Sequence, residues 1–199
     1  MSRMPPRAGI DDLAVEAEVA RPEPRLPAGV EWVATSEQLA EAVRAWVREP
    51  AIGFDVETTL ASRTLCLVQV SNGERTWIVD PFEVGDLRPL ADVLEAQALV
   101  KIIHNASFER SVMKKHGIGL DGVYDTLAES RRRRRNVEGG HSLKAVCRRE
   151  LGLEMDKAEQ LSDWAQRPLN EAQVGYAALD ASVLVELWKR WATSPRFPG

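Results

Sequence analysis

Apolar positions recur along the chain with two different periods, and these periods predict a mixture of strands and helices. Residues 51–57 form a short, mostly apolar run typical of a buried strand, whereas in residues 36–47 the apolar side chains fall on one side of a helix. Pro50 separates the two. The same reasoning predicts strands over residues 30–34, 64–70, 76–79 and 98–104, and helices over residues 87–94, 107–115 (with Ser107 as N-cap), 127 onward, 142–151 and 171–191.

The order of these elements predicts a mixed α/β sheet. The segment Ser71-Asn72-Gly73 carries an Asn-Gly turn signal between two strand patterns, so residues 64–79 are predicted to form a hairpin. With the strand before it, the hairpin makes an antiparallel meander, and alternating helices and strands follow. We therefore expect parallel strands after the meander and helices flanking the sheet on both faces. The expected domain spans residues 29–193, between a disordered leader at 1–28, rich in proline, and a frayed tail at 194–199.

Composition narrows the class of protein without naming a function. The 199 residues are 44% hydrophobic and 28% charged, which is typical of a globular protein. We see no membrane span, signal peptide or zinc-binding pattern, and the only cysteines are Cys66 and Cys147, so free thiols in the cytoplasm are expected. The net charge of −4 argues against attraction of nucleic acid by the whole surface. It leaves room for a local basic patch.

The first candidate for chemistry is the acidic end of the strand at residues 51–57. Side chains alternate across a strand, so Asp55 and Glu57 point to the same face. A hard divalent ion such as Mg²⁺ or Mn²⁺ is the simplest way to hold two carboxylates together. A strand that runs into an acidic turn is the alternative, and for this pair alone it is the commoner case.

Two further segments offer polar side chains of the same kind. Tyr176 and Asp180 are four residues apart and share a helix face, with an apolar context that would bury Asp180. His104 and Asn105 end a buried strand, and Glu109 follows in the first turn of the next helix. An ordinary amphipathic helix and a satisfied buried imidazole remain open as alternatives at this point.

Taken together, these segments resemble a known family. Phe54-Asp55-Val-Glu57-Thr58, His104-Asn105-x-x-Phe108-Glu109 and Tyr176-x-x-x-Asp180 resemble motifs I, II and III of the DEDDy 3′→5′ exonucleases. The segments from Ser142 to Gly152 and from Lys157 to Leu169, the latter with Ser162-Asp163-Trp164, are similar to ribonuclease D. The resemblance runs from about Val30 to Trp191, and three motifs in the right order make it specific.

The resemblance implies a ribonuclease H-like fold and hydrolysis of the terminal phosphodiester with two divalent ions, Mg²⁺ or Mn²⁺. It implies that Asp55 bridges both ions, that Glu57 and Asp180 hold the ion carrying the attacking water, and that Tyr176 orients this water. Glu109 would support the second ion. The implied substrate-binding residues are Thr58, His104, Asn105, Phe108, Lys157 and Gln160.

One position departs from the family pattern, and one run of charged residues has two possible roles. Motif II usually ends in Asp, whereas this chain has Glu109, whose extra methylene moves the carboxylate by about 1.5 Å. A carboxylate acting through water tolerates such a shift, and Mn²⁺ is then a plausible preference. The run Arg131–Arg135 is either a solvated face or a mobile basic arm that holds substrate phosphates.

These observations predict a 3′→5′ exoribonuclease that acts on single-stranded RNA ends or short oligoribonucleotides and releases nucleoside 5′-monophosphates. Because the chain ends soon after motif III, short substrates or a homo-oligomer that shares its grip are expected. A DNA exonuclease is the nearest alternative. A catalytically weakened nucleic-acid-binding module, with Glu109 as the first sign of decay, is the alternative of another class.

Overall fold

A computed structural model of the chain describes residues 24–156 and 158–193. The expected tail at 194–199 and residues 1–23 of the expected leader therefore lie outside the described residues. Of the rest of that leader, Pro24 is buried and Leu26 packs against a hydrophobic cluster. No helix in the described ranges is both long and apolar enough to cross a membrane.

The six strands of the structure form one mixed sheet with the order β1-β4-β3-β2-β5-β6. The antiparallel pairs β2–β3 and β3–β4 make the predicted meander, while β1–β4, β2–β5 and β5–β6 are parallel. The sheet therefore confirms the expected ribonuclease H-like arrangement. Its strands are β1 (Val30–Val33), β2 (Ala51–Thr58), β3 (Leu65–Ser71), β4 (Thr76–Val79), β5 (Val100–Ile103) and β6 (Val123–Asp125).

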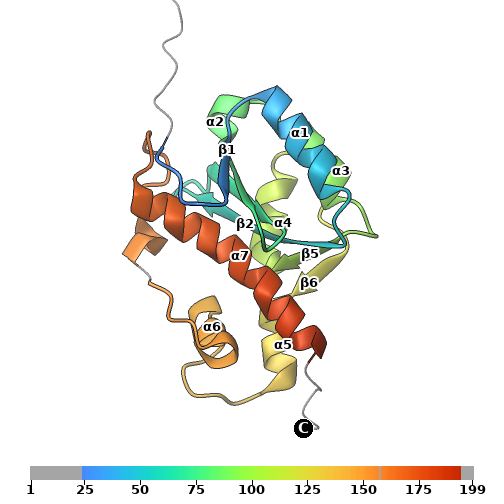
Figure 1. The fold of residues 1–199 in the computed structure, drawn as a ribbon, viewed down its shortest axis with the longest axis vertical. Helices are drawn as coiled ribbons and strands as arrows, with labels where there is room; N and C mark the ends of the chain where they lie inside the picture. Colours follow the sequence, from blue (N-terminus) through green and yellow to red (C-terminus); the bar gives the residue numbers. More distant parts are fainter. Residues whose placement is uncertain (1–23, 157, 194–199) are drawn as a thin grey trace, which may run out of the picture.

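Helices cover both faces of this sheet (Figure 1). The long helix α7 packs across one face against β2, β3, β4 and β5, and α1, α3 and α4 contribute to a hydrophobic core on the other. The helices are α1 (Ser36–Trp46), α2 (Pro81–Val84), α3 (Ala91–Leu94), α4 (Ala106–Lys114), α5 (Thr126–Arg133), α6 (Leu143–Leu151) and α7 (Glu171–Thr193), with 3₁₀ turns η1 (Arg88–Leu90) and η2 (Ala158–Leu161).

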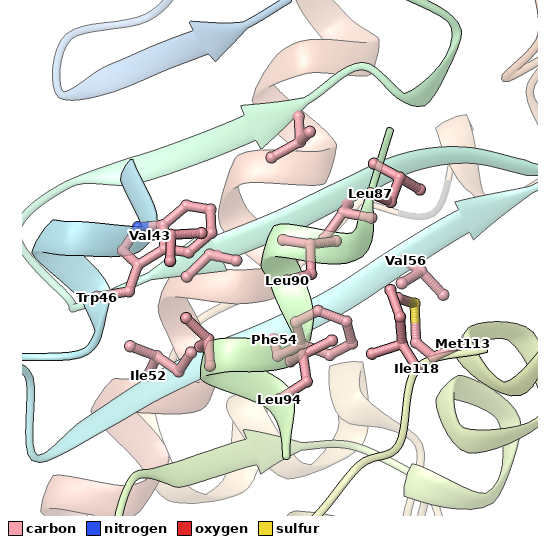
Figure 2. Close-up of a cluster of buried hydrophobic side chains, with 14 of the residues drawn as sticks. Val43, Trp46, Ile52, Phe54, Val56, Leu87, Leu90, Leu94, Met113 and Ile118 are labelled. Atoms are coloured by element: carbon pink, nitrogen blue, oxygen red, sulfur yellow. The ribbon is translucent and has the colours of Figure 1, made fainter. Parts of the chain in front are cut away.

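Alternation along β2 divides its side chains between the two layers. Ile52, Phe54 and Val56 enter the core shared with α1, α3 and α4 (Figure 2). The intervening residues face α7, and a Cβ atom placed on Gly53 would lie 2.1 Å from the carbonyl oxygen of Ala181. Only glycine allows α7 to lie this close to β2. The backbone contact at Gly53 therefore sets the distance between the end of β2 and the helix.

Two local details differ from the sequence predictions. Ser107 was expected to cap the helix after β5, but α4 begins at Ala106 with Asn105 as its N-cap residue, in the left-handed conformation. The carboxylate of Asp125 accepts hydrogen bonds from the backbone amides of Asn105 and Ala106 and so replaces the side-chain cap. The strand that ends in Asp125, β6, was missed because three half-buried residues give no periodic signal.

Candidate active site

Three carboxylates meet where the end of β2 faces the N-terminal half of α7. Asp55 and Glu57 lie on the α7 side of β2, and Asp180 is buried on α7. One oxygen from each of the three lies within 4.8 Å of the others. The prediction that these three side chains come together is confirmed. Among the described residues no Lys, Arg or His side chain forms an ion pair with these carboxylates, and the cluster has the donor set of a site for a hard divalent ion.

Tyr176 adds a hydroxyl group to the cluster. It lies one helical turn before Asp180, and its hydroxyl hydrogen-bonds the Asp180 carboxylate. The indole of Trp164 supports the phenol from the other side, with ring centroids 6.0 Å apart. Trp164 itself is buried. The neutral phenol and the carboxylate are thus held side by side.

Burial and mutual repulsion make this cluster costly to ionise without a cation. Burial, and then the nearby Asp180 and Glu57, raise the pKa of Asp55 well above its usual value. Burial, followed by Asp180, raises the pKa of Glu57 to about 8, and burial raises that of Asp180 to about 6. Burial also raises the pKa of Tyr176, so its hydroxyl keeps its proton at neutral pH. A bound cation would reverse the penalty on the carboxylates.

Glu109 approaches the same cavity from α4. Its side chain is only 3% exposed, and its Oε2 atom has no hydrogen-bond partner among the described residues. Burial raises its pKa to about 8, and Asp125 adds to the effect. It stands apart from the group of three carboxylates whose oxygens lie within 4.8 Å of one another. A buried carboxylate oxygen without a donor is a fit for a second cation or its bound water.

A cavity of about 250 Å³ connects these groups with some of the predicted substrate-binding residues. Thr58, Phe108 and Gln160 line it, whereas His104 and Asn105 do not, and Lys157 lies outside the described residues. Its walls also include the carboxylates and Leu60, a side chain that is 70% exposed. The cavity therefore offers room for a small polar group beside an apolar rim.

His104 lies behind this cavity, in a hydrogen-bonded network. Its Nδ1 atom lies 2.9 Å from Oγ1 of Thr126, and its ring also hydrogen-bonds the backbone of His141. Burial lowers the pKa of His104 to about 4, so the imidazole is neutral near pH 7. The structure gives His104 the position of a half-buried, hydrogen-bonded imidazole that joins β5, α5 and the loop before α6.

Asp125 is a residue that the sequence analysis did not single out. Its carboxylate accepts four backbone hydrogen bonds, from Asn105, Ala106, Leu127 and Ala128, at distances between 2.8 and 3.2 Å. It therefore fixes the start of both α4 and α5, and with it the helix that carries Glu109. An Asp directly before a helix is a known capping signal, and this signal could have identified its role.

The loop after β2 forms the exposed rim of the cavity. The pairing of β2 with β3 shifts register between Glu57 and Thr58, so the chain leaves the regular ladder beside the acidic cluster. The loop then closes on itself, because the amide of Thr59 donates to the carbonyl of Thr64 at 3.0 Å, and the Thr64 amide donates to Thr59 Oγ1 at 3.0 Å. Leu60 lies within this closed loop.

The segment before α7 is anchored by Arg167, which sequence reasoning also missed. Its guanidinium donates to both oxygens of the buried Asp80, at 2.6 and 2.9 Å, and to the carbonyls of Cys66 and Trp164. Two aromatic rings contact the same guanidinium. Since Trp164 supports Tyr176, this ion pair holds the wall of the site in place.

Comparisons with known proteins agree with this geometry. A family model described as 3′-5′ exonuclease matches residues 30–193. The chain is 33% identical over 162 residues to DNA polymerase I of Aquifex aeolicus, covering 80% of this chain and 27% of that protein. It is 31% identical over 163 residues to ribonuclease D of Pseudomonas paraeruginosa, covering 80% of this chain and 43% of that protein.

Solved structures give the same result. The crystal structure of Escherichia coli RNase D, described as an exoribonuclease involved in structured RNA processing, superposes with a TM-score of 0.73 at 27% identity, covering 81% of this chain and 44% of that one. The catalytic core of RRP6 from Trypanosoma brucei gives a TM-score of 0.74 at 26% identity, covering 83% and 46%. The chain spans less than half the length of the curated relatives described above. It belongs to the 3′-5′ exonuclease family, as a ribonuclease D-like member.

Proposed function

We propose that this chain is a metal-dependent 3′→5′ exoribonuclease that removes nucleoside 5′-monophosphates from single-stranded RNA or short oligoribonucleotides. The observation that carries the proposal is the meeting of Asp55, Glu57 and Asp180 within 4.8 Å, beside Tyr176 and in a cavity shared with Glu109. Burying carboxylates lowers the stability of the fold, so packing does not explain this cluster. Metal-dependent hydrolysis of a phosphodiester does explain it.

The donor set fits two divalent cations with oxygen ligands, Mg²⁺ or Mn²⁺. Asp55, Glu57 and Asp180 would hold one, and Asp55 with Glu109, the latter directly or through water, would hold the other. When bound, such a pair stabilises the attacking and leaving oxygens of an in-line displacement. The longer side chain of Glu109 makes Mn²⁺, with its looser geometric demands, the better candidate.

The residues of the chain have their own tasks in this mechanism. Tyr176 keeps its proton, so its hydroxyl orients the attacking water through a hydrogen bond and does not act as a base. Asp180 fixes the phenol in that orientation. Phe108, which a guanidinium from Arg63 contacts at 5.8 Å, offers an aromatic face to the terminal base, and Thr58 and Gln160 offer polar groups to its sugar or phosphate.

A DNA exonuclease is the second candidate, and one observation favours it. The relative at 33% identity is a DNA polymerase I, although it is covered for only 27% of its length. The ribonuclease D relatives and the RNase D structure support RNA. Paired RNA and DNA oligomers of one sequence separate the two functions.

Cellular location and assembly also belong to the proposal. Cys66 and Cys147 are free and buried, which accords with the reducing cytoplasm. A homo-oligomer that shares its grip on RNA stays a prediction, and sedimentation with and without RNA tests it.

The experiment that tests the function follows a 5′-labelled single-stranded RNA of about a dozen nucleotides in Mn²⁺, Mg²⁺ or EDTA. We expect a ladder that shortens from the 3′ end, only with metal. The Asp55→Asn/Asp180→Asn double variant should show none, whereas Asp92→Asn, a change at an exposed carboxylate on α3, should match the unsubstituted protein. Intact RNA and DNA in both metals, with folded protein, would reject the proposal in favour of a binding module.

A further inference from the structure

Positive charge is concentrated in one part of a chain that is acidic as a whole. Residues 126–152 carry eight Lys and Arg against three Asp and Glu, although the chain has a net charge of −4. These residues form α5, α6 and the loop between them. Figure 1 shows them at one end of the molecule, where α6 packs against the C-terminal half of α7. The acidic cluster and this basic segment therefore lie against the same helix, α7.

Part of this charge is engaged in contacts that support the fold. The guanidinium of Arg133 is almost buried, donates to Glu129 at 2.8 Å and to the carbonyl of Trp191 at 2.9 Å, and contacts the Trp191 ring. Arg132 also pairs with Glu129, and Arg134 lies 3.8 Å from a Glu150 oxygen. The arginine run is therefore not a uniformly solvated face, because Arg133 fastens α5 to the end of α7.

Apart from the exposed Arg131 and Arg135, the available charge lies on α6. A cavity of about 710 Å³ opens between α6 and the loop before it, lined by Glu138, Gly139, Ser142, Lys144, Ala145, Arg148 and Arg149. Lys144 makes no ion pair or hydrogen bond with any residue in the described ranges. Arg148 pairs with Glu154 at 2.9 Å, but both side chains are more than half exposed, so the pair is easily exchanged for another anion. Arg149 is held in the wall by Ser130 and Gly140.

The wall of this groove is linked by hydrogen bonds of His141 to the network behind the active site. The residue directly precedes Ser142 in the cavity wall, its Nδ1 atom lies 2.8 Å from the Ser130 hydroxyl, and its backbone bonds the His104 ring. His104 in turn follows β5, next to the helix that carries Glu109. His141 therefore links the wall of the groove to the network that lies behind the acidic cavity.

We propose that the groove on α6 binds the backbone phosphates of the nucleotides that lie 5′ of the one being removed, with Lys144 and Arg148 as its charged contacts. This inference rests on the proposed function, because it assigns the path of the same single strand. The acidic cluster repels phosphate until metal is bound, so cations away from it are needed to hold the strand. Contacts with phosphates bind the backbone and do not distinguish the bases, so the groove would accept any sequence.

The test measures binding of a labelled single-stranded RNA dodecamer in EDTA, where no hydrolysis occurs, from about 50 to about 300 mM salt. Each lost phosphate contact lowers the slope of log K against log salt by about 0.7 for single strands, so Lys144→Gln/Arg148→Gln should lower it by about 1.4. The matched control is Arg44→Gln, an exposed cation on α1, which should leave the slope unchanged. A slope equal to that of the control would overturn the proposal.

A second measurement separates failure of the groove from failure of the proposed function. With Mn²⁺, the double variant should lose efficiency on the dodecamer roughly tenfold more than on a dinucleotide, which has no backbone phosphate 5′ of the one being cleaved. Equal losses on both substrates would also overturn the groove. Hydrolysis of neither substrate by the unsubstituted protein would reject the exonuclease, while a changed salt slope would still support the groove as a nucleic-acid-binding surface.

Discussion

Glu109 offers a sharp test of the electrostatics of this site, because the metal-free protein should be more stable without its charge. Burial raises the pKa of this carboxyl from 4.5 to about 8. The folded chain therefore binds the proton more tightly than the unfolded chain does. As a consequence, the contribution of Glu109 to the free energy of unfolding is fully present below about pH 4.5 and is lost as the pH rises to about 8.

The size of this effect follows from the same numbers. One pKa unit is worth about 1.4 kcal/mol, so the interval from 4.5 to about 8 corresponds to at most roughly 5 kcal/mol. Glu109→Gln keeps the shape of the side chain and removes its titration. We expect the variant to be more stable than the unsubstituted protein by between about 2 and 5 kcal/mol at pH 8, and of nearly equal stability at pH 5.

Urea unfolding in EDTA at several pH values between 5 and 9, followed by circular dichroism, measures this difference. Glu41→Gln, at an exposed position of α1, is the matched control and should leave the free energy of unfolding unchanged at both ends of the pH range. Added Mn²⁺ should restore the stability of the unsubstituted protein at pH 8, because a bound cation stabilises the ionised carboxylates. Parallel pH profiles for Glu109→Gln and the unsubstituted protein would refute the reasoning, since Glu109 would then be ionised in the folded state at no cost.

Three further substitutions test other parts of the structure. Gly53→Ala should destabilise the fold by roughly 1–3 kcal/mol or more and abolish hydrolysis, because its Cβ would meet the Ala181 carbonyl at 2.1 Å; thermal unfolding and the gel assay measure both. Arg167→Ala should cost roughly 3–5 kcal/mol by leaving the Asp80 carboxylate buried and unpaired, whereas a loss below about 1 kcal/mol in urea unfolding would contradict that role. Tyr176→Phe should lower kcat roughly a hundredfold with little change in KM, and an unchanged kcat would remove its hydroxyl from the mechanism.

The parts of the site that the sequence predicts are those that follow from local geometry. The two-residue period of a strand puts Asp55 and Glu57 on one face, and the helical period puts Tyr176 beside Asp180. Both predictions are confirmed by the cluster. Motif order then indicated that Glu109 joins them, and the structure places it on the wall of the same cavity.

The parts that it does not predict depend on contacts between distant segments. Arg167 and Asp80 are 87 residues apart, and no pattern in either segment specifies the partner. The contact of Arg133 could not be predicted for the same reason. A run of five arginines favours a solvated face, whereas Arg133 donates a hydrogen bond to the carbonyl of Trp191, 58 residues away. For a related reason the sequence could not decide whether His104 contacts substrate or is a hydrogen-bonded imidazole. Only the fold brings Thr126 and His141 to its ring.

The closed loop between Thr59 and Thr64 has a consequence for how members of this family can differ from one another. Its two ends are tied together by hydrogen bonds, and the register shift after Glu57 has already released the chain from the sheet. Residues inserted between these ends would lengthen the rim without transmitting strain to the carboxylates. The loop at the entrance can thus change in length during evolution without a change in the carboxylates. Family members can therefore share the same acidic residues and differ in the length of this rim.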